Sequence, residues 1–209
     1  MSLPGSPYVA YAFEILYSKL HRIRPPLSLS SFKSCYGVPI SHRTEKHPLF
    51  VTWNIIVGSE KELRGCIGTF SPMEIQSGIK EFALTAAFQD NRFDPIELEE
   101  LEELSCDITL LKDFEKVEDI WDWDLGTHGI RISFTYHNRL RSATFLPDVA
   151  VEQNWDKETT MRYLVAKGGG PRSITDFGKL DISLTRYKGE KSHITYSEFK
   201  EIRKRAVSH

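Results

Sequence analysis

The chain has 209 residues, of which 40% are apolar and 27% are charged, values that exclude a disordered or fibrous protein. Its net charge of −2 disfavours a globally basic nucleic-acid binder. The sequence contains no apolar stretch of roughly 18 residues, so we expect no membrane-spanning helix.

The first third of the chain predicts one helix and one β-hairpin. Ser6 supplies a capping hydroxyl before Pro7, and apolar residues then recur at helical spacing. A Ser-rich segment follows, and then a run of β-branched and aromatic residues that ends at a turn, Gly58-Ser59. We therefore expect a helix over about 7–22, a loop over 27–48, and paired strands over 50–57 and 63–70.

Proline marks two further helix starts. Ser71 and Asp94 each precede a proline, and each has a glutamate three residues later, which is typical of a capping box. We therefore predict that helices begin at these two caps. Four glutamates follow the second cap, and their spacing among leucines favours a solvated face over an acidic binding tail: Glu99, Glu100, Glu102 and Glu103.

Alternating polarity and capping residues mark the second half of the chain, apart from an irregular segment over 112–128. The predicted elements are strands over 106–110, 130–136, 140–146 and around 182–185, a helix over about 157–167, and a short basic helix after Thr195. Two of the strand pairs form hairpins, and hairpins require antiparallel pairing. We therefore predict an α+β fold with a mainly antiparallel sheet and flanking helices, rather than a doubly wound parallel sheet.

The segment Leu63–Phe70 carries the strongest chemical signal. Gly65 and Gly68 flank Cys66 inside a predicted strand, where glycine marks a bulge or a close backbone approach. Arg64 shares a strand face with Cys66, and a nearby guanidinium favours the thiolate form. The same residues also fit a buried structural cysteine beside a bulge, so both interpretations stay open.

Leu63–Phe70 also resembles the signature of the AMMECR-domain family. Further blocks resemble that family in the same order: Ala86–Pro95, Gly126–Ile130, Ala143–Val149, Glu152-Gln153 and Trp155-Asp156. The resemblance implies one AMMECR domain over 1–209, with two unequal lobes and a cleft near the signature. The larger lobe is expected from both chain ends and the smaller one from the middle of the chain. No activity is implied, because the biochemical function of the family is unsettled.

Three residues outside the octapeptide are candidates for the same site. Asp90 could orient Arg92, and Arg92 could bind a carboxylate or phosphate through two parallel hydrogen bonds. An Asp–Arg pair that only pins the loop is an equally good interpretation. His128 is a candidate base for Cys66, the candidate nucleophile, although a loop histidine is more often a surface hydrogen-bonding group.

The three cysteines, Cys35, Cys66 and Cys106, are widely spaced and odd in number. They form neither a disulfide framework nor a zinc-binding C-x-x-C pair, so we expect a protein of the reducing cytoplasm or nucleus. The first residues lack the basic start and apolar core of a secretory signal. No two histidines stand four residues apart, and we expect neither a metal nor a cofactor.

Three functions compete. In the first, a cleft around Cys66 and the arginines Arg64 and Arg92 binds a small or protein-borne anionic group and is catalytic. In the second, the chain is a non-catalytic intracellular adaptor that holds a protein partner. A nucleic-acid-binding module is the weakest, because the chain lacks a basic balance and an aromatic-basic run. The residues do not decide between enzyme and adaptor.

Overall fold

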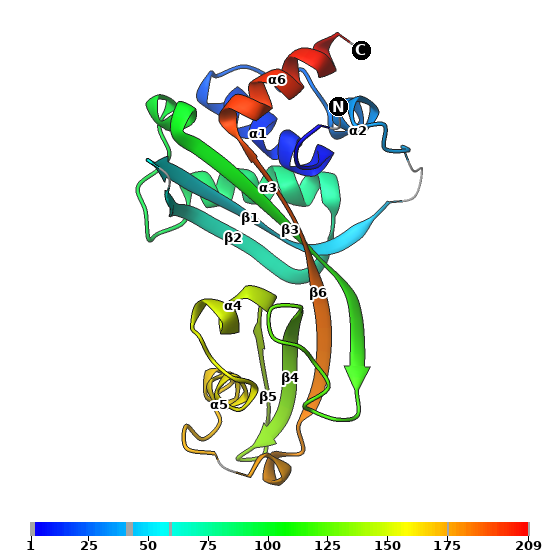
Figure 1. Cartoon of the computed structure of the whole chain (residues 1–209), viewed down its shortest axis with the longest axis vertical. Coiled ribbons are helices and arrows are strands. Elements are labelled where there is room, and N and C mark those ends of the chain that lie inside the picture. The colour runs from blue at the N-terminus through cyan, green and yellow to red at the C-terminus, as the bar shows by residue number, and fades with distance from the viewer. Residues whose placement is uncertain (1–2, 41–43, 59, 175, 209) are drawn as a thin grey trace. The chain divides into compact units, whose positions relative to one another are not determined.

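The computed structural model describes residues 3–40, 44–58, 60–174 and 176–208, and it confirms the α+β fold (Figure 1). The strands are antiparallel wherever their register is recorded, and they form one sheet in the order β2-β1-β3-β6-β4-β5. The strands are β1 (Lys46–Val57), β2 (Glu60–Glu74), β3 (Leu104–Val117), β4 (His128–Tyr136), β5 (Arg139–Phe145) and β6 (Ser183–Thr195). The helices are α1 (Pro7–Leu20), α2 (Leu29–Cys35), α3 (Ile75–Phe88), α4 (Pro147–Glu152), α5 (Lys157–Lys167) and α6 (Tyr196–Val207), with short 3₁₀ helices η1 (Leu98–Glu103) and η2 (Phe177–Leu180).

The chain divides into two compact units. Unit 1 comprises Met1–Leu110 and Lys191–His209, and unit 2 comprises Leu111–Glu190. The long strands β3 and β6 contribute residues to both units.

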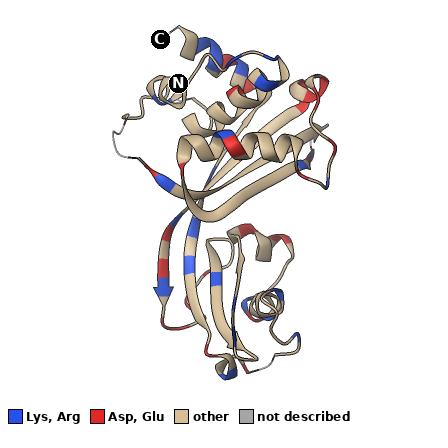
Figure 2. Cartoon of the chain, turned by 180° about the vertical axis from the view of Figure 1, so that it is seen from behind, with Lys and Arg blue, Asp and Glu red and all other residues tan. Residues whose placement is uncertain are grey.

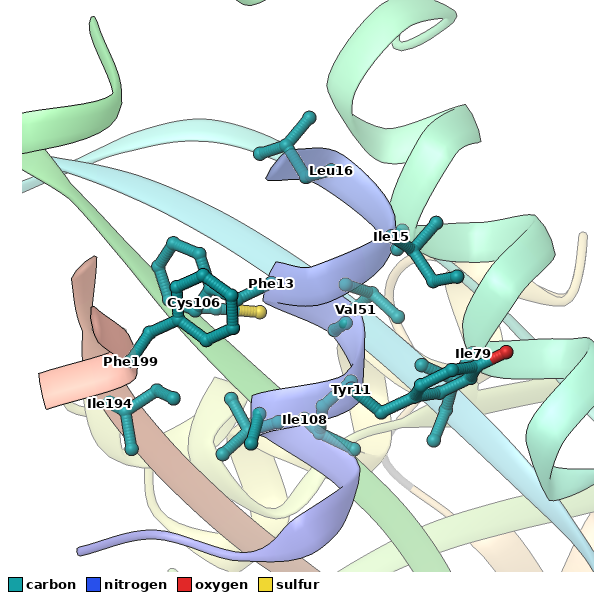
Figure 3. Packing of buried hydrophobic residues seen from close by; sticks show 14 of the residues in the cluster. Tyr11, Phe13, Ile15, Leu16, Val51, Ile79, Cys106, Ile108, Ile194 and Phe199 are labelled. Carbon is teal, nitrogen blue, oxygen red and sulfur yellow. The ribbon is translucent and has the colours of Figure 1, made fainter. Parts of the chain in front are cut away.

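In unit 1, helices pack on one face of β1, β2 and β3. The indole of Trp53 on β1 is fully buried on that face and donates to the Ala83 carbonyl oxygen of α3 at 2.9 Å. Phe13 of α1 contacts the same indole edge-on and stacks on Phe199 of α6 at 5.2 Å. Figure 3 shows the rings of Phe13 and Phe199 with Cys106 inside the resulting core.

In unit 2, β4 and β5 form the predicted hairpin, and β6 pairs with β4 on its other side. His137 and Asn138 both adopt positive φ, as a two-residue hairpin turn requires. The predicted helix over 157–167 is confirmed as α5, with the Asp156 side chain capping it. Its apolar face packs on β4 and β5 in a second core.

Three predicted helix and loop boundaries are wrong. The predicted loop over 27–48 contains α2, which Ser28 and Ser31 start with a capping box. Ser71 does not cap a helix, because β2 stays paired with β1 as far as Glu74, and Glu74 then caps α3. The second predicted helix begins at a Glu97 capping box rather than at Asp94. At Ser71, pairing between β2 and β1 overrides the local helix-start signal. At the second helix, the N-cap residue is Glu97 rather than one of the short polar side chains that usually cap helices.

The segment over 112–128, predicted to be irregular, begins with the end of β3, which runs to Val117. The structure also contains α4, for which no element was predicted. The turn residue Ser59 lies outside the described residues. Among the described helices, none is both long enough and apolar enough to cross a membrane.

Candidate functional site

The predicted close backbone approach at the signature glycines is confirmed. A Cβ atom on Gly65 would lie 2.1 Å from the Ala86 carbonyl oxygen of α3. A Cβ atom on Gly68 would lie 2.3 Å from the Leu49 carbonyl oxygen of β1. Both neighbours are backbone atoms, so neither can move aside at low cost. The glycines therefore seat β2 tightly between its neighbours and hold the Cys66 backbone in place.

A buried carboxylate joins the signature strand to the loop after α3. Asp90 is 3% exposed at its side chain, and it accepts a hydrogen bond from the Cys66 N–H at 2.9 Å. It also accepts from Arg92 Nε at 2.9 Å and from Arg92 Nη2 at 2.6 Å. The hydrogen bond from the Arg92 side chain is the main reason that the pKa of Asp90 lies well below its ordinary value. Asp90 is therefore ionised at neutral pH and fixes Arg92 relative to Cys66.

Arg92 remains half accessible although it braces Asp90. Its side chain is 52% exposed, and its Nη2 also lies 3.3 Å from the Cys66 carbonyl oxygen as a donor. No described hydrogen bond uses its Nη1. A cleft of about 500 Å³ opens at this point and is lined by Arg64, Asn91, Arg92, Phe93 and Asp94. The geometry therefore combines both roles that the sequence left open, a brace for Asp90 and a donor facing a cleft.

Arg64 points away from the predicted partnership with the thiol. Its Nε and Nη2 donate to Glu100 at 2.6 and 3.1 Å, and its remaining donors reach the carbonyl oxygens of Asp94 and Pro95. The register of β1 and β2 skips Arg64, so it occupies a bulge and not a regular position beside Cys66. Glu100 is correspondingly not part of a purely solvated acidic face. Its carboxylate compensates the charge of Arg64 at the rim of the cleft.

Cys66 is half-buried, and its sulfur accepts a hydrogen bond from the Thr52 hydroxyl at 3.1 Å. Thr52 is paired with Cys66 on one side and with Asp107 on the other, so these three side chains lie on one face of the sheet. Cys106 is paired with Trp53 and therefore lies on the opposite, helix-covered face. Burial raises the pKa of the Cys106 thiol well above its ordinary value. Of these two cysteines, Cys66 is partly exposed and Cys106 is fully buried.

His128, the candidate base, lies at the start of β4 in unit 2, whereas Cys66 lies in unit 1. Its Nδ1 accepts the Asp124 N–H at 3.0 Å, and its side chain is 11% exposed. This arrangement ties the ring to the loop that precedes β4. A role as base for Cys66 remains a prediction that nothing within unit 1 supports.

A second histidine was missed by the sequence analysis. His193 of β6 lies with its Nδ1 2.8 Å from Asp107 Oδ1, and Asn54 Nδ2 donates to the other carboxylate oxygen at 2.8 Å. Lys61 Nζ lies 3.1 Å from His193 Nε2. The same Nζ also lies 3.1 Å from His193 Nδ1, so the lysine contacts both nitrogens of the ring. We name these four residues, Asn54, Lys61, Asp107 and His193, the Asp107 network.

The Asp107 network lies on the same sheet face as Cys66, because Asp107 is paired with Thr52 and Thr52 with Cys66. The alternating pattern around Asp107 indicated a polar sheet face. Sequence carried no signal for the partnership itself, since Asp107 and His193 are 86 positions apart. Among the described residues, no group of three or more His, Cys, Asp or Glu side chains is arranged to hold a metal ion.

Comparison with known proteins identifies relatives along most of the chain. The AMMECR1 family model matches residues 9–192, which confirms the resemblance inferred from the octapeptide. An uncharacterized protein of Kluyveromyces lactis is 40% identical over 212 residues, covering 93% of each chain. An uncharacterized protein of Arabidopsis thaliana is 44% identical over 164 residues, covering 77% of each chain.

A solved structure supports the fold. The crystal structure of an uncharacterized protein from Pyrococcus horikoshii superposes with a TM-score of 0.61 at 22% identity. The match covers 92% of this chain and 94% of the other. At this level of identity the likeness concerns the fold alone.

Proposed function

This chain belongs to the AMMECR1 family, and we propose that unit 1 binds a small or protein-borne anionic group through Arg92, next to the Cys66 thiol. The observation that carries the proposal is the Asp90 clamp. One buried carboxylate holds both the Cys66 N–H and the Arg92 guanidinium, and this leaves Arg92 half exposed over a cleft. A carboxylate or phosphate is the group that a fixed, planar guanidinium recognises best.

The cleft selects its ligand by geometry more than by excess charge. Arg64 is compensated by Glu100, and Arg92 by Asp90, while Asp94 also lines the cleft. A free anion can therefore accept hydrogen bonds from Nη1 of Arg92 and from the Asn91 amide, but it meets no cation whose charge is uncompensated. We expect a dissociation constant for small anions of about 1 mM, equivalent to roughly −4 kcal/mol. Tighter binding would require a larger ligand that also covers neighbouring surface.

The polar sheet face beside the cleft offers that neighbouring surface. Thr52 orients the Cys66 sulfur, and the Asp107 network places the His193 imidazole further along the same face. We propose that a ligand anchored by Arg92 extends along this row, with Cys66 as the reactive group. His193, in the same unit as Cys66, is a better candidate for proton transfer than His128.

Thermal melts with added anions test the proposal. Phosphate, sulfate, acetate and succinate are added at constant ionic strength, and the melting temperature should rise with at least one of them. The same anion should slow alkylation of Cys66 by iodoacetamide, as read by peptide mass mapping. Arg92→Gln should abolish both effects. Arg92→Lys should restore them only in part, because an ammonium lacks the planar pair of donors.

Lys80→Gln is the matched control. Lys80 is an exposed cation of α3 outside the cleft, so its replacement removes the same charge and should leave both effects intact. A wild-type melt that is insensitive to all four anions, together with a large stability loss in Arg92→Gln, would leave Arg92 only as a brace for Asp90. That result would overturn the proposal.

A further inference from the structure

A cavity in unit 2 lies between β5 and one face of α5. It has a volume of about 780 Å³, within the range of small-molecule sites. Its aromatic and cationic lining consists of Phe145, Trp155, Arg162, Tyr163, Lys167 and Arg172. Neither the signature octapeptide nor the proposed function of unit 1 involves any of these residues.

The sequence of α5 explains why these side chains gather. Asp156 caps the helix, so positions 159, 162, 163, 166 and 167 fall on one face at helical spacing. The opposite face carries Met161, Leu164 and Val165, which are fully buried in the core. The cavity face is therefore not needed for packing, although it carries one large aromatic and two cationic side chains.

Three rings form a continuous aromatic wall. Trp155 and Tyr163 are stacked with centroids 4.3 Å apart and planes inclined by 11°. Phe145 lies 5.8 Å from Trp155. Tyr163 is 52% exposed, so the stack ends in an accessible ring face. An accessible aromatic face of this kind stacks favourably with a further planar ring.

The cations at this wall are only partly compensated. Lys167 Nζ donates to the Thr144 carbonyl oxygen at 2.9 Å and lies 4.7 Å from the Phe145 ring centroid. Arg162 pairs with Glu158, whereas no ion pair of Lys167 or Arg172 occurs among the described residues. Among the described residues that line the cavity, none carries a carboxylate. The chain as a whole is slightly acidic, so this concentration of positive charge is local (Figure 2).

We propose that this cavity binds a small ligand that joins a planar aromatic ring to a phosphate group, as in a mononucleotide. The ring extends the Trp155–Tyr163 stack, and the phosphate lies between Lys167 and Arg172. A purely apolar ligand would leave the two cations desolvated without a partner, which is costly. A simple inorganic anion would leave the aromatic wall unused.

Isothermal titration of the full chain with matched probes tests this inference. Phenyl phosphate and the four nucleoside monophosphates carry both features, adenosine carries only the ring, and ribose 5-phosphate and inorganic phosphate carry only the anion. At least one probe of the first group should bind with a dissociation constant below about 1 mM. It should bind about tenfold more tightly than either kind of partial probe, since each feature contributes on the order of 1.4 kcal/mol.

The double variant Lys167→Gln, Arg172→Gln should weaken that probe about tenfold or more, because it removes both phosphate donors. Both residues are exposed, so folding should be unaffected, and circular dichroism melts check this. Tyr163→Ala should weaken binding of the same probe, because it removes the aromatic ring on which the probe stacks. Lys179→Gln, at a 79% exposed cation of unit 2 outside the cavity lining, is the control and should bind like the wild type.

Three results would overturn the inference. In the first, no probe with both a ring and a phosphate binds with a dissociation constant below about 1 mM. In the second, the double variant binds the probe as tightly as the wild type does. In the third, a single-stranded oligonucleotide binds much more tightly than any monophosphate. The last would make the cavity part of a nucleic-acid surface. Arg92→Gln should leave this binding unchanged, so the outcome is independent of the site proposed in unit 1.

Discussion

Asp90→Asn is the substitution that examines the candidate site most directly. The amide keeps the shape of the side chain but replaces one acceptor oxygen by a donor, so that it faces the N–H groups of Cys66 and Arg92. It also removes the charge that compensates Arg92. Breaking a fully buried ion pair costs about 3–5 kcal/mol, and a lost hydrogen bond to a charged group about 1.5–3. Because Arg92 is 52% exposed and can be solvated again, we expect a loss of about 2–4 kcal/mol in unfolding free energy.

The pH dependence supplies a second readout for Asp90→Asn. The pKa of Asp90 is lowered in the folded protein, mainly by its hydrogen bond from Arg92. The unfolded chain therefore binds more protons in acid than the folded chain does. Stability from Asp90 is fully present above the unfolded pKa of about 4 and is lost as the pH falls below it. The wild-type advantage over Asp90→Asn should shrink accordingly between about pH 5 and pH 2.

Urea denaturation at several pH values measures both effects, and Asp94→Asn is the matched control. Asp94 lies in the same loop and bears the same charge, but it is exposed and no described hydrogen bond uses its carboxylate. Its replacement should change stability by less than about 0.5 kcal/mol. Equal stability of Asp90→Asn and Asp94→Asn, or a difference that does not vary with pH, would refute the clamp as described.

Gly65→Ala should lower the free energy of unfolding by about 2–3 kcal/mol, because the new Cβ meets the Ala86 backbone. The control Gly178→Ala should lower it by less than about 1 kcal/mol, because its Cβ would meet only a flexible carboxylate at 3.3 Å. Equal denaturation midpoints for the two variants would contradict this reasoning. Glu14→Gln should cost about 3 kcal/mol in the same assay, because this fully buried carboxylate on α1 accepts from an α6 guanidinium at 2.8 Å. Alkylation of the native protein at pH 8 should label Cys66 and spare Cys106, whose pKa is raised by burial. Labelling of Cys106 at the rate of Cys66 would show that the core opens readily.

Local sequence signals determined much of this protein by themselves. Capping residues and apolar periodicity correctly placed α1, α5 and α6, and the alternation around His137-Asn138 predicted the β4–β5 hairpin. The glycines of the octapeptide correctly predicted a close backbone approach, because a strand tolerates glycine poorly without such a reason. These features result from interactions among residues close together in the sequence, so the local sequence is enough to predict them.

Tertiary structure alone decided the partnerships at the candidate site. The i, i+2 spacing predicted that Arg64 shares a strand face with Cys66, but Arg64 lies in a bulge and its guanidinium pairs with the distant Glu100. The sequence offered His128 only as one candidate base for Cys66 and did not indicate His193, which unit 1 brings to the same sheet face through a contact over 86 positions. Sheet register sets such pairs, and register results from the packing of whole strands and helices, a long-range balance that no local pattern encodes.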